Sequence, residues 1–292
     1  MDRLPYLFCD AVVGTIGAFD KPKKQLDLFN NSRFSKWKSA FEYHHSNRQA
    51  FALWIGFVDG NWSYEFYKFY AKEGESEYFD FKTVQQLRRK YLQIASVNYT
   101  EHALENICSF KEIDEITKFI TPFMNLASLD LNNKQIEEIR LSSLLSHFRN
   151  AQCQFDLLTV ASYRICYEDL LLSQMRSDLL ECLKISGDNW PKEVQLGLEK
   201  FVHTKSFEAV YCESSNFVFQ KPFFENLFEL PKSKKVILFV GKFSFEFKDL
   251  QKFKEELQFS SGRNCLAWKR EDGVWIFVQN CNGFLRIKIY PM

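Results

Sequence analysis

Apolar residues recur with a helical period near the amino end of the chain. Pro5 suits the first turn of a helix, because its missing N–H would have no partner there. The residues after it form an apolar stripe too broad for one small helix to bury by itself: Phe8, Cys9, Val12, Val13 and Ile16. The pattern predicts a helix that begins at Pro5 and needs a second surface to cover its stripe.

The apolar pattern changes to that of β-strands between residues 50 and 81. Runs rich in aromatic and β-branched residues flank Asp59-Gly60. Asp-Gly between two such runs is typical of a tight hairpin turn, which needs positive φ at both residues. We expect a hairpin here, followed by a third strand near residues 78–81.

From Thr83 to about Leu257 the pattern alternates between a helix and a strand. The strand portions share one spacing of apolar residues: Leu126, Leu129, Leu131; Phe155, Leu158, Val160; Leu180, Leu183, Ile185; Phe207, Val210, Cys212; and Val236, Phe239, Gly241. Successive units begin 25 to 29 residues apart. That spacing resembles the leucine-rich repeat, whose period is about 20 to 29 residues. Asn132 and Asn133 are the nearest candidates for its consensus asparagine, and an earlier, irregular unit lies near Leu92.

Amphipathic segments lie between these strands. Their apolar faces are Ile113, Ile116, Ile120 and Phe123; Leu141, Leu144 or Leu145, and Phe148; Val194, Leu198 and Phe201; and Leu250, Phe253 and Leu257. Pro191 and Pro222 lie where two helices should begin, and Pro231 lies where one should end. The pattern predicts parallel strands joined by helices, with each unit packed against the next.

After Leu257 the pattern returns to short strands separated by turn residues. Residues 265–270, 274–278 and 284–289 predict a three-stranded meander with turns at Gly273 and Asn282-Gly283. We expect it to cover the last strand of the repeat region, which would otherwise present unpaired backbone.

The amino-terminal stripe resembles the F-box motif. The motif's Leu-Pro opening and apolar slots are filled by Leu4, Pro5, Phe8, Cys9, Val12, Val13 and Ile16. A short apolar helix and a tryptophan helix among basic residues should follow, and the matching residues are Leu26, Leu28 and Phe29, then Phe34, Trp37 and Phe41. The sequence departs from the motif at Leu7, where an acidic residue is usual, and in its lysine-rich linker at 21–24. The whole chain resembles the lineage-expanded nematode F-box-like families.

The predicted fold class is therefore mixed, α+β or α/β, in four parts. An F-box-like helical module occupies residues 1–45, and a β-hairpin element occupies 46–82. A leucine-rich-repeat-like helix–strand solenoid follows at 83–257, with a C-terminal β cap at 258–292.

Composition narrows the classes of partner. The 292 residues include 38 Lys and Arg and 37 Asp and Glu. These nearly equal numbers give no overall electrostatic attraction to nucleic acid or to an anionic membrane. With 31 Phe and only 11 Gly, the chain favours aromatic packing over a glycine-rich nucleotide loop. The amino end does not resemble a signal peptide, and no apolar run is long enough to span a bilayer. We expect a cytoplasmic or nuclear protein in a reducing compartment.

No pattern of catalytic or metal-binding residues is found. The eight cysteines form no C-x-x-C pair, and we expect them to act as small buried apolar residues. His44-His45 is the only histidine pair, and its side chains diverge on a helix, so we expect a solvated helix end. The basic run at 232–235 is interpreted as a solvated loop. We predict no catalytic residue, metal or cofactor.

The F-box resemblance implies a substrate receptor of an SCF-type cullin-RING ubiquitin ligase, which is not itself an enzyme. It implies that a Skp-type adaptor is bound by Leu4, Pro5, Phe8, Val12, Val13, Ile16, Phe34 and Trp37. Strand residues between the buried positions would face the target protein, and the candidates are Asp130, Asn132, Thr159, Lys184, Tyr211 and Lys242.

Two other functions stay open. In the first, the chain is a solenoid scaffold that binds no ligase, and its amino-terminal helices pack on the hairpin near Trp54 and Phe57. In the second, an enzyme is built on the same architecture, which would need a pocket of convergent titratable groups.

Overall fold

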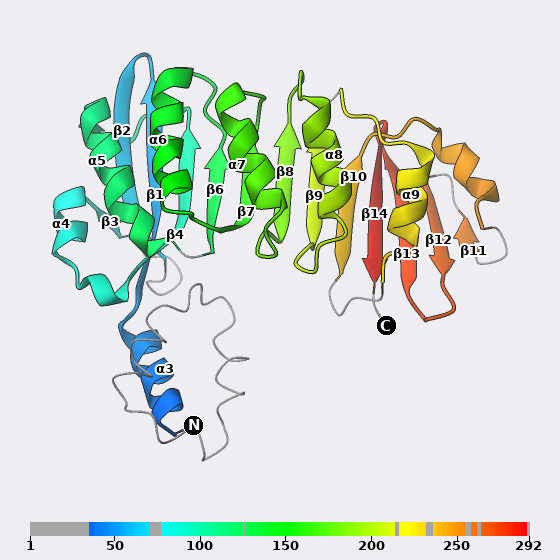
Figure 1. Ribbon diagram of the computed structural model, residues 1–292, viewed down its shortest axis with the longest axis horizontal. Helices are drawn as coiled ribbons and strands as arrows, with labels where there is room; N and C mark the ends of the chain where they lie inside the picture. Colours follow the sequence, from blue (N-terminus) through cyan, green and yellow to red (C-terminus); the bar gives the residue numbers. More distant parts are fainter. Residues whose placement is uncertain are drawn as a thin grey trace. The chain divides into compact units, whose positions relative to one another are not determined.

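The computed structural model describes residues 35–69, 77–124, 126–213, 216–231, 236–254, 258–261 and 264–290 (Figure 1). The chain divides into two compact units, Met1–Phe155 and Asp156–Met292, and both are mixtures of helices and strands. None of the helices in the described ranges is long and apolar enough to cross a bilayer.

The first unit is built on a mixed sheet with strand order β3-β2-β1-β4-β6. β1, β4 and β6 are parallel, whereas β2 is antiparallel to β1 and also pairs with β3 and β5. Its elements are α3 (Ser35–Asn47), β1 (Gln49–Val58), β2 (Asn61–Phe69), β3 (Tyr78–Phe79), α4 (Phe81–Gln86), η2 (Arg89–Tyr91), β4 (Leu92–Thr100), β5 (Asn106–Cys108), α5 (Phe110–Ile120), η3 (Thr121–Phe123), β6 (Ala127–Leu131) and α6 (Glu138–Asn150).

The predicted hairpin is confirmed. Asp59 and Gly60 have φ of 50° and 84°, as a two-residue turn between β1 and β2 requires. The third strand is also present, as the short β3.

The core of the first unit lies between its sheet and the helices α5 and α6. Ser109 caps α5, because its Oγ accepts a hydrogen bond from the backbone N–H of Glu112 at 3.2 Å. The predicted apolar faces of both helices are buried: Ile113, Ile116 and Ile120, then Leu141, Leu144, Leu145 and Phe148. In the sheet, Phe66, Leu53, Val97 and Leu129 lie side by side on four strands and are all fully buried.

The second unit alternates strands and helices before it ends in a meander. β7, β8, β9 and β10 are parallel, and the strand order is β7-β8-β9-β10-β14-β13-β12-β11. Its elements are β7 (Phe155–Val160), α7 (Ile165–Met175), β8 (Cys182–Ser186), α8 (Lys192–Phe201), β9 (Ala209–Glu213), α9 (Lys221–Phe228), β10 (Ile237–Gly241), η4 (Phe247–Lys252), β11 (Gln258–Ser261), β12 (Cys265–Lys269), β13 (Trp275–Cys281) and β14 (Phe284–Tyr290).

One apolar residue from each of the seven strands β7 to β10 and β12 to β14 forms a continuous core row across this second sheet. The row consists of Leu158, Leu183, Val210, Phe239, Ile287, Val278 and Leu266, each at most 1% exposed. The first four are the middle positions of the predicted repeat, so the predicted strand pattern is confirmed there. Val236, expected as the first position of the last unit, is instead 46% exposed because β10 begins after it.

The proline signals are also confirmed. Pro191 immediately precedes α8, Pro222 lies in the first turn of α9, and α9 ends before Pro231. The predicted alternation implies a helix where α7 lies, but no apolar face was assigned to it, because its Leu170-Leu171-Leu172 run hides the helical period.

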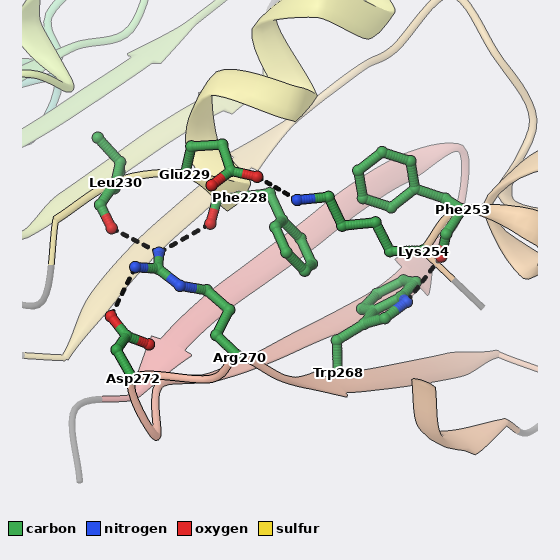
Figure 2. A network of polar contacts seen from close by, with 8 residues as sticks. All are labelled: Phe228, Glu229, Leu230, Phe253, Lys254, Trp268, Arg270 and Asp272. Carbon is green, nitrogen blue, oxygen red and sulfur yellow. Dashed lines mark hydrogen bonds and ion pairs between the residues drawn. The ribbon is translucent and has the colours of Figure 1, made fainter. Parts of the chain in front are cut away.

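The predicted C-terminal meander is present, with β11 as an unexpected fourth strand. β14 pairs antiparallel with β10, from Ile237 opposite Ile289 to Gly241 opposite Leu285, so the last parallel strand is not left as an edge. Figure 2 shows how β12 is also held to the end of α9. Arg270 Nη1 donates to the carbonyl oxygens of Phe228 and Leu230, at 2.9 and 2.6 Å, and Trp268 Nε1 donates to that of Phe253 at 2.9 Å.

Candidate functional site

Most of the predicted adaptor-binding residues lie outside the described part of the chain. These are Leu4, Pro5, Phe8, Val12, Val13, Ile16 and Phe34. Trp37 is described, and its half-buried side chain belongs to α3. The adaptor-binding role of these residues stays a prediction.

The second sheet presents a face that points away from its helices. Helices α7, α8 and α9 lie together in front of the strands in Figure 1. The side chains of the core row are buried, as expected of the sheet face that the helices cover. Because side chains alternate along a strand, the residues between the core positions project from the opposite face. Three of the predicted target-binding residues are among them.

The strand register brings these three residues into one row. Thr159 lies opposite Lys184, and Lys184 lies opposite Tyr211. The Lys184 Nζ lies 5.4 Å from the centre of the Tyr211 ring, which is within the range of a cation–π contact. The row continues through Val240 on β10 to Arg286 on β14.

A second row runs beside the first on the same face. It consists of Cys182, Ala209, Leu238, Lys288 and Phe277. Together the two rows form an apolar strip with cations on both sides. The strip consists of Ala209, Tyr211 and Leu238, which are half-buried, and of Val240, which is only 7% exposed. It is flanked by Lys184 on β8 and by Arg286 and Lys288 on β14. We call these seven residues the basic face.

Charge on and around the basic face is predominantly positive. Lys242 and Lys269 project from the same side of β10 and β12, and Lys184 and Arg286 are exposed. Glu213, at the end of β9, is the exposed carboxylate among these outward strand positions. Further carboxylates gather at the amino ends of the strands. Burial raises the pKa of the Cys182 thiol, which lies at this end of β8. Lys184 lowers this pKa, whereas the carboxylates of Glu208, Asp156 and Glu181 raise it.

Aromatic rings extend the face along the meander. The Trp275 and Phe277 rings stack with centroids 5.9 Å apart, and Tyr290 contacts Phe277 edge-on at 5.4 Å. Lys269 Nζ lies 5.5 Å from the centre of the Trp275 ring. Each of these rings is therefore already covered in part by another ring or by a cation.

Lys242, the fourth predicted target residue of this unit, lies at the carboxyl end of β10. It lines an open pocket of about 460 Å³ with Phe243, Phe245, Glu246, Phe247, Lys248, Asn280, Gly283 and Leu285. It does not join the Thr159, Lys184 and Tyr211 row.

The two remaining candidates belong to the first unit. Asp130 on β6 is the end of a row across four paired strands. The row continues through Asn98 on β4 and Trp54 on β1 to Glu65 on β2. These positions border an open pocket of about 550 Å³ lined by Ala52, Trp54, Glu65, Tyr67, Tyr78, Ser96, Asn98, Leu104 and Ser128. Asn132 lies beyond the end of β6, with its side chain exposed.

Burial disfavours the reactive thiolate form of two described cysteines. Burial raises the pKa of Cys108 to about 12 and that of Cys153 to about 11, so both thiols stay protonated at neutral pH. Cys153 and Cys212 are buried as expected, whereas Cys265 is exposed. Within the described ranges, no three His, Cys, Asp or Glu side chains come together to hold a metal ion.

Only Lys184 and Tyr211, two of the seven residues of the basic face, were predicted from the sequence as site residues. Arg286, Lys288 and Leu238 were assigned only to strands, because the meander was interpreted as a cap. The signal was present, since Arg286 and Lys288 alternate with the apolar Leu285, Ile287 and Ile289. What was missing was the pairing of β14 with β10, which places these cations opposite Val240 and Leu238.

The described residues form two candidate binding surfaces. The basic face combines cations with an apolar strip, and the pocket beside Trp54 combines aromatic and polar side chains. No family model matches the chain, and neither a curated protein nor a solved structure matches it.

Proposed function

We propose that this chain is a substrate receptor of an SCF-type cullin-RING ubiquitin ligase. Its amino-terminal F-box-like helices bind a Skp-type adaptor, and its repeat region binds a target protein. The F-box resemblance of Leu4, Pro5, Phe8, Val12, Val13 and Ile16 supports the first half of this proposal. The basic face supports the second half.

The observation that carries the target-binding half is the adjacency of Thr159, Lys184 and Tyr211. These residues are 25 or more positions apart in sequence, yet the register places them side by side on neighbouring strands. Surfaces with an apolar centre and a charged rim are typical of protein interfaces.

In finer detail, we propose that residues 83–257 form a leucine-rich-repeat-like solenoid and that the meander is its cap. The alternation of parallel strands with α7, α8 and α9 supports this description, as does the pairing of β14 with the last parallel strand. The buried amide of Asn133 also supports it, because this side chain binds backbone carbonyls as a repeat asparagine would.

A receptor of this kind performs no bond chemistry itself. It holds the target near the ubiquitin-charged enzyme of the ligase, so target lysines experience a raised effective concentration of the reactive thioester. The receptor therefore needs two binding surfaces and no catalytic group.

The alternative is a scaffold whose amino-terminal helices pack on its own hairpin near Trp54 and Phe57. The structure places these two side chains on opposite faces of the sheet. Trp54 is 41% exposed beside the pocket, while Phe57 is buried with its ring 4.6 Å from that of Trp62. A helix docked on one of them would not reach the other.

Adaptor binding is tested by the double substitution Val12→Asp and Ile16→Asp. Two carboxylates in the apolar stripe would have to lose their water at the interface, so co-purification with a Skp-type adaptor should be abolished. Ile139→Asp with Ile165→Asp is the matched control, because both side chains are exposed, at 85% and 72%. The control should keep the adaptor, and circular dichroism should show both variants folded. Adaptor binding by the folded V12D/I16D variant would refute the receptor proposal.

A further inference from the structure

The basic face has a charge that the whole chain lacks. The full sequence is balanced, with a formal charge of +1. The basic face brings together Lys184, Arg286 and Lys288 from strands distant in sequence. Glu213 lies on the same face, and Glu208, Asp156 and Glu181 lie near Cys182 at the amino ends of the strands. The seven members of the basic face carry a net positive charge, which would attract anionic groups of a partner.

We propose that the basic face binds an acidic, extended segment of a target polypeptide, in which two carboxylates flank an apolar side chain. This inference deepens the proposed function, since it names the class of target, and it rests on the target-binding half of it. The apolar side chain packs on Ala209, Tyr211 and Leu238, the half-buried members of the strip. The flanking carboxylates pair with Lys184 at one side and with Arg286 or Lys288 at the other.

The spacing of the two carboxylates follows from the strand order. β8 and β14 are separated by β9 and β10, so Lys184 and Arg286 lie three strand spacings apart, or about 14 Å. An extended chain advances about 3.4 Å per residue, so carboxylates four residues apart span the same distance. Tyr211 and Val240 lie between the two cations, and the half-buried Tyr211 would meet the intervening side chains.

The aromatic rings favour a polypeptide over a single-stranded nucleic acid. Binding of bases on a sheet depends on open ring faces for stacking. Here Lys184 lies over Tyr211, Lys269 lies over Trp275, and Trp275 and Phe277 stack on each other. The cations remain able to pair with carboxylates, whereas the ring faces are already in contact.

The test measures fluorescence anisotropy of a labelled peptide in which two glutamates flank an Ala-Leu-Ala triplet, with the full chain as receptor. A second peptide carries glutamine in place of both glutamates, and a third carries lysine. The full chain should bind the glutamate peptide about twofold to thirtyfold more tightly than the glutamine peptide.

Charge-reversal variants test whether the basic face is the surface that binds the peptide. Lys184→Glu with Arg286→Glu should weaken binding of the glutamate peptide about tenfold or more and should create binding of the lysine peptide. The gained binding shows that the variant is folded. Lys192→Glu with Lys205→Glu changes the net charge equally at exposed positions on α8 and after it, and should leave both affinities unchanged.

Three outcomes would overturn the inference: equal affinity for the glutamate and glutamine peptides, an unchanged affinity in K184E/R286E, or tighter binding of an oligouridylate probe at the same face. Co-purification of the same variants with the Skp-type adaptor distinguishes a failure of the acidic-peptide inference from a failure of the proposed ligase function. Retained adaptor with no peptide binding refutes the acidic target alone, and lost adaptor in the unmodified chain refutes the ligase role alone.

Discussion

Asn133 joins three segments of the first unit through one buried amide. Its Nδ2 donates to the carbonyl oxygen of Phe57 at 3.0 Å and to that of Thr100, and its Oδ1 accepts from the N–H of Gln135 at 2.8 Å. The side chain is 2% exposed. It therefore satisfies the second-to-last carbonyl of β1 and the last carbonyl of β4, where those two parallel strands end.

Removing this amide should destabilise the protein. Asn133→Ala leaves two buried carbonyls and one N–H without their partner, which costs about 2–3 kcal/mol in the free energy of unfolding. Asn132→Ala is the control, since that exposed side chain should contribute less than about 0.5 kcal/mol. Urea denaturation followed by circular dichroism measures both, and equal effects would contradict the role given to Asn133.

For single residues, the sequence gives two candidates for the buried asparagine and does not choose between them. Both Asn132 and Asn133 fit the predicted repeat. The position of Leu131 at the end of β6 decides that Asn133 is the one that turns inward. His44 was expected at a solvated helix end and is instead fully buried, with its ring 5.4 Å from that of Tyr91. The reason is helical geometry, because His44 follows the buried Ala40 by one turn.

Whole elements are predicted where their pattern is local. The hairpin, α5, α8 and the meander each carry their own turn residues, cap or apolar stripe, so a short window defines them. The candidate site is not local in this sense. Lys184 and Tyr211 occupy strand positions that the repeat pattern predicts. Arg286 and Lys288 lie beside them only because β14 pairs with β10 on one side and with β13 on the other. That strand order depends on tertiary pairing, which the spacing of residues does not encode.

The attachment of the meander to α9 depends on the planar guanidinium of Arg270 (Figure 2). Besides its two carbonyl acceptors, Arg270 donates through Nη2 to the carboxylate of Asp272 at 2.6 Å. A lysine ammonium at this position lacks the rigid fork that reaches all three acceptors. Arg270→Lys should therefore lower the free energy of unfolding by about 1–3 kcal/mol.

The matched control for Arg270 is Arg286→Lys, on an exposed position of β14, which should change stability by less than about 0.5 kcal/mol. Thermal unfolding of the two variants compares them directly. A similar melting temperature for both would show that the contacts of Arg270 do not stabilise the meander.

For the whole molecule, the two proposed binding surfaces differ in their chemistry. The amino-terminal stripe of Phe8, Val12 and Ile16 would bind its adaptor by burial of apolar surface, which salt weakens little. The basic face would bind its target through Lys184, Arg286 and Lys288, and pairs between exposed charges are screened by salt. A change in ionic strength should therefore alter the affinity for the target much more than the affinity for the adaptor.

Raising sodium chloride from about 0.1 M to about 0.5 M shortens the screening length from about 10 Å to about 4 Å. Affinity for the glutamate peptide should fall severalfold, while the amount of co-purified adaptor should stay nearly constant. Anisotropy titration and adaptor pull-down on one preparation of the full chain measure both quantities. If peptide binding proved insensitive to salt, the cations would not be its main contact and the apolar strip would have to account for it. If adaptor binding fell in parallel, charge rather than the apolar stripe would hold the adaptor, and the F-box-like interaction would be excluded.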